Sequence, residues 1–491
     1  MTVSFPLRLH APGKHRAVSA QGRASASADR PDLSKFAFPV LAVGAIFQAI
    51  MQTVIVPLLP SLPGFTGAGP TAVSWLVTST LLVGAVMTPI FGRLADMIGK
   101  KQMLLIAFGL MTIGSLICAL TSNIGLLIFA RGLQGAGAAV LPIGMAILRE
   151  VMPRDRVDRS IAILSSTLGI GTAVGIPFAA AIVQFADWHL LFWVTTAIGL
   201  GVTVAASFVI RPSSTRTGGR FDVAGAAGLT GALICLLVPI TQGSAWGWTS
   251  AAVLTMFVCS ILLFAIWGFQ QLRNRNPLVD LRVSARRSVL TPHLSALLVG
   301  FAFYGNTLIT TQLLQAPPER GAGYGLTILQ AAACQLPASF AMMIFALVAS
   351  RVSDRFGPKI AIMIGATFLI VGYSVHAVPD KPLWTVVAAI FIAAIGTTFV
   401  YCTLPILLLG AVPLSQNAAA NGVNVLLRTV GSTVCSAVVA TVLAAHMVAG
   451  GIGSSGFVIV YLVCGACAVV VFVSAFALPS VGSRMPRPAG V

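Results

Sequence analysis

The chain has 491 residues, of which 57% are apolar and only 9% are charged, and its mean hydropathy is +0.95. Soluble domains carry about a quarter charged residues, so this composition excludes an ordinary soluble protein and indicates one that lies in a bilayer. The formal net charge of +18 does not by itself indicate a nucleic-acid partner, because in a membrane protein the placement of charges matters more than their sum.

Apolar windows of about 20 residues, the length that crosses ~30 Å of hydrocarbon as a helix, recur along most of the chain. They predict fourteen membrane-spanning helices, which begin near Phe36, Thr71, Met103, Ile124, Ile161, Leu190, Val223, Ala251, Val289, Leu326, Ile360, Leu383, Ala418 and Ser455. The basic segment before them, residues 1–35, is predicted to be a disordered cytoplasmic tail, with an organelle transit peptide as the alternative.

The basic residues predict the topology. Nearly all of the 30 Lys and Arg residues fall in the tails and in alternate connections between the windows. The positive-inside rule therefore predicts that both termini are cytoplasmic, which an even number of spans allows. Arg320 and Lys381 are the exceptions in loops, and Arg131 and Arg428 lie within spans.

One phrase occurs twice, as GRLADMIGKK over Gly92–Lys101 and as SRVSDRFGPK over Ser350–Lys359. Each copy connects the second and third spans of a block of six, and such internal repeats are typical of transporters. We expect a conformational latch built from Gly92, Asp96, Gly99, Asp354 and Gly357. We predict that residues 36–211 and 288–479 form two six-helix bundles. Residues 212–287 are predicted to form a linker with two inserted, peripheral helices, and residues 480–491 a cytoplasmic tail.

These residues carry a family resemblance. GRLADMIGKK resembles the signature loop of the major facilitator superfamily, and FARGLQGAGAAVLP, which contains Arg131 and Gln134, is similar to its Arg-x-x-Gln-Gly-x-Gly motif. The segments GRFDVAGAAGLTGALICLLVPITQGSAWGW, NPLVDLRV and NGVNVLLRTVGS look like those of the fourteen-span drug:proton antiporter branch, which includes multidrug and quaternary-ammonium exporters. The resemblance implies the all-α major facilitator fold, with two six-helix bundles and an inserted helix pair, and a coupling role for Arg131.

The chain departs from that branch in span five, where the exporters carry Gly-x-x-x-Gly-Pro-x-x-Gly-Gly and this chain has GTAVGIPFAAA. Gly171 and Gly175 keep a spacing that lets two helices approach closely, and Pro177 can bend the helix. We expect these three residues to take part in the conformational switch. The loss of the last two glycines weakens the inference of antiport from the family.

Span one departs further, because Gln52 replaces the acid that the branch commonly has ahead of its Thr-Ile-Val stretch. All 12 Asp and Glu residues lie in tails, loops or span ends. A carboxylate within a span is the usual device for coupling a proton to transport, so the coupling ion stays open. His293, Asp187, Glu319 and Asp380 are the remaining candidates, and a hydrogen-bonded or solvated role is the simpler interpretation for each.

Polar side chains at bilayer depth are costly unless they face water or one another, so they indicate the inner faces of the two bundles. The predicted substrate cavity comprises Gln48, Gln52, Thr53, Gln134, Tyr304, Asn306, Thr307, Thr310, Thr311, Gln330, Gln335, Asn421, Asn424 and Arg428. The alternative for several of them is a hydrogen bond between neighbouring helices. Arg131 has two interpretations as well, a structural cation or a coupling residue, and the resemblance favours the second.

The sequence therefore predicts a monomeric, multi-pass secondary transporter of the plasma (inner) membrane that exports small amphipathic compounds by alternating access. Its expected partners are a small-molecule substrate, the lipid bilayer and, by the resemblance, protons, with no nucleic acid. Import of a polar metabolite and a non-transporting sensor remain alternatives. Because no carboxylate is expected at cavity depth, neutral or anionic compounds should be handled better than quaternary ammonium cations.

An enzyme embedded in the membrane is a rival of a different class. Such an enzyme needs a nucleophile and a base, or metal ligands, at one depth. The sequence has no H-E-x-x-H, G-x-S-x-G or Walker motif, so we expect no enzymatic activity, no cofactor and no metal. The eight cysteines fall in apolar windows, and even the pair Cys464 and Cys467 is interpreted as packing.

Overall fold

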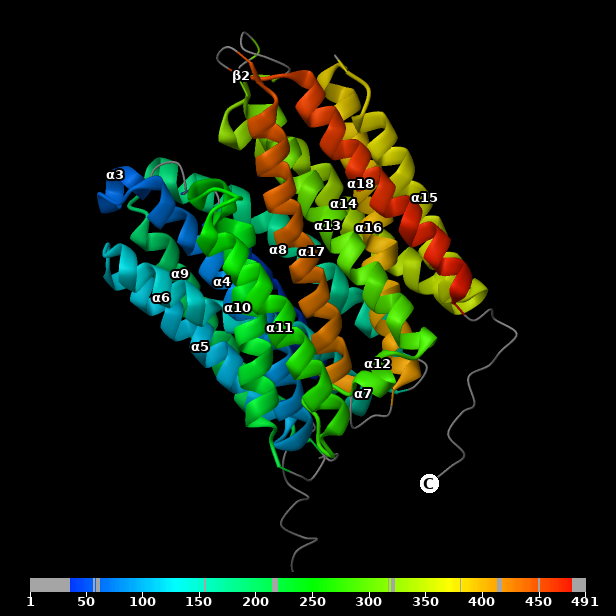
Figure 1. Ribbon diagram of the computed structural model, residues 1–491. Helices are drawn as coiled ribbons and strands as arrows, with labels where there is room; N and C mark the ends of the chain where they lie inside the picture. Colours follow the sequence, from blue (N-terminus) through cyan, green and yellow to red (C-terminus); the bar gives the residue numbers. More distant parts are fainter. Residues whose placement is uncertain are drawn as a thin grey trace, which may run out of the picture.

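The computed structural model describes residues 36–55, 58, 62–153, 156–213, 220–316, 318, 323–379, 381–412, 417–448 and 451–478. The predicted tails, 1–35 and 480–491, lie outside the described residues, as do Glu319, Arg320 and Asp380. Helices make up almost all of the described chain (Figure 1).

The first half of the chain forms helices that begin close to the predicted windows. They are α2 (Ala37–Thr53), α3 (Leu62–Thr66), α4 (Pro70–Met97), α5 (Lys100–Leu120), α6 (Ile124–Gly135), α7 (Val140–Val151), α8 (Val157–Phe185) and α9 (His189–Val209). The predicted fourth span is divided into α6 and α7 by a turn of 3-10 helix, η4 (Ala136–Ala139). Starts differ by a few residues because polar residues such as Lys100 continue the helix beyond its apolar part.

The remaining helices follow the same pattern. They are α10 (Val223–Trp246), α11 (Ala251–Arg273), α12 (Leu281–Ser284), α13 (Arg287–Gln315), α14 (Ile328–Phe356), α15 (Pro358–His376), α16 (Leu383–Ala411), α17 (Asn417–Ala445) and α18 (Ser454–Ser474), with the 3-10 turn η7 (Ala475–Ala477) after α18. The strands β1 (Met447–Val448) and β2 (Gly451–Ile452) pair antiparallel between α17 and α18, with Met447 opposite Ile452.

Twelve helical segments within the described residues are long and apolar enough to cross a membrane, counting α6 to α7 as one. Helix α2, with 17 residues, is apolar but shorter, and α8 lies where the fifth span is predicted. The membrane character of the protein is thus established by helix length and composition. That α2 and α8 also cross, which makes fourteen spans, stays a prediction.

Each half has its own apolar core. In α5, Leu104, Phe108 and Met111 recur at helical spacing and are fully buried, whereas Ile106 and Ile113 on the other face are exposed. The second large cluster gathers apolar side chains of α13 and α15 to α18 around Tyr373 and Tyr461. An exposed apolar face around a buried core is the pattern expected for helices that contact lipid.

The two halves meet mainly along two helix pairs, α4 with α17 and α8 with α14, and α7 with α17 and α8 with α16 add smaller contacts. Helix α10 packs against both α4 and α17, through a cluster that includes Ala85, Leu233 and Leu426 (Figure 1). Helix α11 packs on α10, and its Phe264 and Trp267 contact the edge of the same cluster. The inserted pair is therefore attached at the seam between the halves through α10, and its peripheral role in transport stays a prediction.

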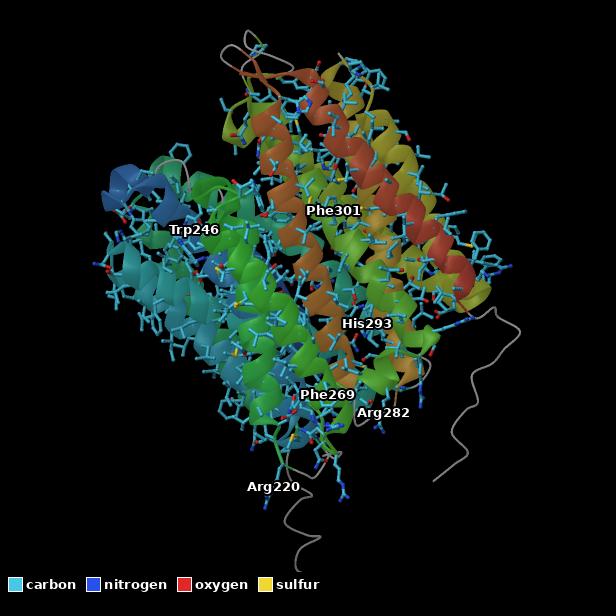
Figure 2. The ribbon with its side chains drawn as sticks, viewed as in Figure 1. Arg220, Trp246, Phe269, Arg282, His293 and Phe301 are labelled. Carbon is cyan, nitrogen blue, oxygen red and sulfur yellow. The ribbon has the colours of Figure 1, made fainter. Side chains whose placement is uncertain are left out.

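The helix bundle has two ends, which we call the latch end and the hairpin end. The latch end carries the turns α4–α5 and α14–α15 and helix α12, and the hairpin end carries β1 and β2 (Figure 1). Figure 2 shows Arg220 and Arg282 at the latch end and Trp246 at the opposite end of α10. Basic side chains thus mark the latch end, as the charge pattern of the sequence predicts for one membrane face.

Candidate functional site: the latch and the polar cavity

The two copies of the repeated phrase share a backbone feature. Gly99 has a φ of +136° between α4 and α5, and Gly357 has a φ of +90° between α14 and α15. Residues with a Cβ rarely adopt these conformations, so the helix reversal requires glycine at both positions. The repeat seen in the sequence is therefore also a repeat in structure.

Asp96 joins the two halves at the latch end. Its side chain is buried, with 1% of the residue exposed, and its Oδ2 accepts a hydrogen bond of 3.1 Å from the backbone N–H of Ala419 in the first turn of α17. A carboxylate is favoured there because the first N–H groups of a helix carry partial positive charge. One turn earlier, a Cβ added at Gly92 would lie 2.7 Å from the carbonyl oxygen of Ala418, so α4 and α17 are in direct contact.

A second acid completes the latch, and sequence reasoning missed it. Glu150, at the end of α7, lies 2.5 Å from the Nζ of Lys100, and the same Nζ lies 3.9 Å from Asp96 Oδ1. Lys100 is 1% exposed, so its ammonium group is buried between these two acids. The available signal was the position of Glu150 at the end of a predicted span on the same side as Lys100.

Asp354 does not repeat the role of Asp96. Its side chain is exposed, and it makes no hydrogen bond or ion pair with any residue that the structure describes. In this conformation Asp354 thus lacks the contact between the halves that Asp96 makes, and its expected part in the latch stays a prediction. The latch is asymmetric, with its carboxylate engaged only between α4 and α17.

Arg131 ties three helices together inside the first half. It is 1% exposed, and its guanidinium donates to the carbonyl oxygens of Met51 (2.8 Å) and Leu76 (3.3 Å) and to Gln134 Oε1 (2.6 Å). Gln134 in turn donates to Ser115 Oγ at 3.1 Å. Among the described residues, no carboxylate lies within 4.0 Å of Arg131. These contacts fit the structural interpretation, and its coupling role stays a prediction.

Helix α8 lies directly on α2 through the two glycines of the altered span-five motif. A Cβ added at Gly171 would lie 2.2 Å from the Cβ of Ala49, and one added at Gly175 would lie 2.5 Å from Thr53 Oγ1. The helix continues through Pro177 as a single element. The predicted close approach is present, and it brings α8 against the helix that carries Gln48 and Gln52.

The first-half cavity residues differ in environment. Gln48 is 6% exposed, whereas Gln52, four residues later on the same helical face, is exposed. Thr53 is occupied within its own helix, where its Oγ1 lies 3.2 Å from the carbonyl oxygen of Ile50 and contacts α8 at Gly175. Of this group, Gln52 is the exposed side chain.

In the second half, several predicted cavity residues bond one another. Thr310 Oγ1 lies 3.0 Å from the hydroxyl of Tyr461 and 3.5 Å from Asn306 Oδ1, and Gln335 Nε2 donates to Thr311 Oγ1 at 3.3 Å. Thr307 donates to a carbonyl of its own helix, and Tyr304 is half-buried against the second core. A polar layer therefore joins α13 to α14 and α18.

Helix α17 adds three further residues. Asn421 and Asn424 are buried, and Asn424 Nδ2 donates to the carbonyl oxygen of Pro292 at 3.4 Å. The guanidinium of Arg428 lies 4.6 Å from the centroid of the Tyr401 ring, a cation–π contact that offsets part of the cost of a cation in a span. No described hydrogen bond links the predicted cavity residues of the first half to those of the second.

Gln330 has a different role from the predicted one. It lies at the start of α14, where its Oε1 accepts from the backbone N–H of Thr327 and its own N–H donates to Thr327 Oγ1, which is a capping box. The side chain is exposed and is engaged in capping the N-terminus of the helix. Gln330 is therefore a helix cap, and its assignment to the cavity is not supported.

Of the alternative titratable candidates that the structure describes, Asp187 has the local role expected for it, whereas His293 lacks the expected hydrogen bond. Asp187 is exposed in the α8–α9 loop, and hydrogen bonds from the backbone and the ring of His189 lower the pKa of its carboxyl group. It is the solvated loop charge that the simpler interpretation expects. His293 is buried in α13, and neither ring nitrogen has a hydrogen-bond partner among the described residues.

The comparison with known families decides the identity of the fold. The sequence matches the family description Major Facilitator Superfamily over residues 41–436. The chain belongs to the major facilitator superfamily. The human organic anion transporter MFSD10 (TETRAN) has the same fold, with a TM-score of 0.66 and 13% identity over 91% of this chain and 100% of that one.

Relatives of this major facilitator protein carry names that refer to drug resistance, and one of them also to export. The multidrug resistance protein Stp of Mycobacterium tuberculosis is 28% identical over 82% of this chain and 74% of its own length. The tetracenomycin C resistance and export protein of Streptomyces glaucescens is 27% identical over 66% and 60%. The putative multidrug resistance protein MdtD of Salmonella dublin is 28% identical over 67% and 68%.

Family membership confirms the resemblance derived from the repeated phrase and from the Arg131 motif. The protein is a multi-pass secondary transporter with the all-helical major facilitator fold. It therefore belongs with transporters, the class that the sequence favours.

Proposed function

We propose that this transporter exports small amphipathic compounds across the plasma membrane by alternating access, with fourteen spans and both termini in the cytoplasm. The observation that supports the export direction is its likeness to proteins named for multidrug resistance and export. In this proposal the latch end faces the cytoplasm, in keeping with its basic side chains.

The contacts between the halves support a mechanism in two states. Asp96 and Gly92 hold α4 against α17 at the latch end, and Cys402 of α16 donates to the carbonyl oxygen of Ala162 in α8 at 3.4 Å. We assign this arrangement to the state that is closed toward the cytoplasm. Opening requires these contacts to break while the bundles, residues 36–211 and 288–479, rotate about the cavity between them.

The proposed cavity accepts compounds through Gln48, Gln52 and Gln134 from the first half and through the polar layer around Asn306, Thr310 and Gln335 from the second. Arg428 adds positive charge at the same side of α17 as Asn424. A cavity with amide and hydroxyl groups and a cation suits neutral or anionic amphipathic substrates better than cations. Protons are the proposed driving ion by likeness to the antiporter branch, and a monomer is the proposed functional unit.

The direct test is transport by the purified protein in proteoliposomes. Neutral, anionic and cationic fluorescent amphiphiles would be loaded inside, and their efflux would be followed with an imposed proton gradient of either sign. Export of neutral or anionic compounds that depends on the gradient supports the proposal. Accumulation of a polar metabolite would favour the importer, and absence of any transport together with ligand binding would favour the sensor.

A further inference from the structure

A cavity of about 400 Å³ lies at the latch end, beside the segment that joins α11 to α13. We call it the linker cavity. Its lining comes from Arg93 of α4, from Arg275 to Asp280, Val283 and Ser284 of the connecting segment, and from Val289, Val412, Ala419, Ala420 and Val423 of the second half. Its volume lies in the range of small-molecule sites, roughly 300–1,000 Å³, and an occupant would contact both halves and the linker.

Two arginines, Arg93 and Arg275, line the linker cavity. Arg93 is half-buried and Arg275 is exposed, and neither makes a hydrogen bond or an ion pair with a described residue. The acid in the lining, Asp280, is already engaged, because its Oδ1 accepts from the backbone N–H groups of Arg282 and Val283 at 3.1 Å. Two guanidinium groups with free donors are suited to a phosphate or carboxylate group.

Part of the lining of the linker cavity is apolar. Val289 and Val412, which are 1% and 6% exposed, form a small apolar cluster with Leu408, against which Val283 and Ala420 pack. Both valines line the cavity together with Arg93 and Arg275. The lining is therefore amphipathic, because it combines two guanidinium groups with aliphatic side chains.

The linker wall is fixed by the inserted helix pair. The backbone N–H of Val279 donates to Gln271 Oε1 at 3.1 Å, and Gln271 Nε2 donates to Asp222 Oδ2 at 2.6 Å. Burial alone would raise the pKa of Asp222, but hydrogen bonds from Gln271, Gly225 and Gln270 outweigh it and lower the pKa, so the anchor is an ionised carboxylate. The site is thus preformed and needs no ordering of the linker on binding.

We propose that the linker cavity binds an amphipathic anion, with its phosphate or carboxylate head at Arg93 and Arg275 and a short apolar segment against Val289 and Val423. Ala419, the latch partner of Asp96, also lines this cavity. An occupant loses contacts when α4 and α17 separate, so by linkage it favours the closed latch. The ligand can come from the inner leaflet, as an anionic lipid, or from the cytoplasm.

Binding is tested on the full-length protein in phosphatidylcholine nanodiscs by thermal unfolding. One arm replaces part of the lipid by phosphatidylglycerol, and the other adds hexyl phosphate in solution. We expect a higher Tm in one or both arms, and the arm that responds identifies the source of the ligand. Arg275→Gln should weaken the apparent affinity about tenfold, the order expected for one charge-assisted hydrogen bond.

Two further variants keep the test decisive. Ser284→Trp fills the cavity without removing a charge and should abolish the rise in Tm. It is preferred to Arg93→Gln, because Arg93 lies in the latch phrase and its substitution could disturb the latch itself. Arg286→Gln removes an exposed cation of the same end that does not line the cavity, and it should respond as the unmodified protein does. A Tm that ignores both anions, or one that rises equally in all variants, overturns the proposal.

An effect of the bound anion on the transport rate rests on the proposed function, whereas the measurement of Tm does not. If binding is lost in the variants as expected but no compound is ever transported, the proposed function fails and the anion site stands. If transport proceeds and the Tm ignores both anions, the site fails alone. If the protein transports and also binds the anion, phosphatidylglycerol should slow efflux by the unmodified protein more than by Arg275→Gln.

Discussion

Removing the charge of Asp96 should weaken the latch without unfolding the protein. The carboxylate accepts the N–H of Ala419 at 3.1 Å and is buried at the start of α17. Asn at this position keeps an acceptor oxygen but loses the favourable interaction of a charge with the helix N-terminus, worth up to ~2 kcal/mol in a partly buried site. Lys100 stays paired with Glu150 in the variant, so no buried cation is left alone.

A loss of about 1–2 kcal/mol lowers the ratio of closed to open latch by roughly 5- to 30-fold. The assay is the rate at which a water-soluble maleimide labels a cysteine introduced at Ala420, which lines the linker cavity beside the latch. Labelling in inside-out vesicles should accelerate by about tenfold in Asp96→Asn, since 1.4 kcal/mol corresponds to a factor of ten. Transport per molecule should fall severely, with membrane abundance near normal.

Asp354→Asn is the matched control, because Asp354 is the exposed counterpart in the second copy of the phrase. It should leave both the labelling rate and transport close to those of the unmodified protein. Unchanged labelling and transport in Asp96→Asn would refute the latch, and equal effects of the two substitutions would show that the copies are equivalent after all.

Gly99→Val should reduce transport and abundance, since a φ of +136° costs a residue with a Cβ about 1–3 kcal/mol; normal transport would make the turn a simple connection. Gly171→Ala should slow transport because its Cβ would overlap Ala49, whereas Gly109→Ala, with open space around it, should not; equal rates would exclude a tight α2–α8 contact. Gln52→Asp should improve ethidium efflux and its sensitivity to an uncoupler, and efficient uncoupler-sensitive ethidium export by the unmodified protein would contradict the argument from missing acids.

The sequence predicted the helices well because their signal is local. A window of apolar residues indicates its own helix. The differences are at the ends, as at Lys100, where polar residues extend the helix, and in the fourth window, which a 3-10 turn divides. The capping role of Gln330 was also within reach, because Thr327 and Gln330 have the spacing of a capping box.

The partners of the functional residues were harder to predict. Asp96 binds a backbone N–H that lies 323 positions later, and a backbone donor leaves no trace in residue identity. The pairing of Lys100 with Glu150 depends on how α5 and α7 pack, which apolar periodicity does not determine. The position of α10 across the seam has the same cause, since its apolar surface would suit lipid as well as protein.

The central claim is that the two halves must separate at the latch end for each transport cycle. Ala162 of α8 lies next to the native Cys402 of α16, whose Sγ donates to its carbonyl oxygen, so Ala162→Cys places two thiols across the interface between the halves. Efflux from proteoliposomes would be measured before oxidation, after oxidation and after reduction, with the unmodified protein treated in parallel. The account predicts that the disulfide abolishes efflux and that reduction restores it. Full-rate efflux by the cross-linked protein would contradict it.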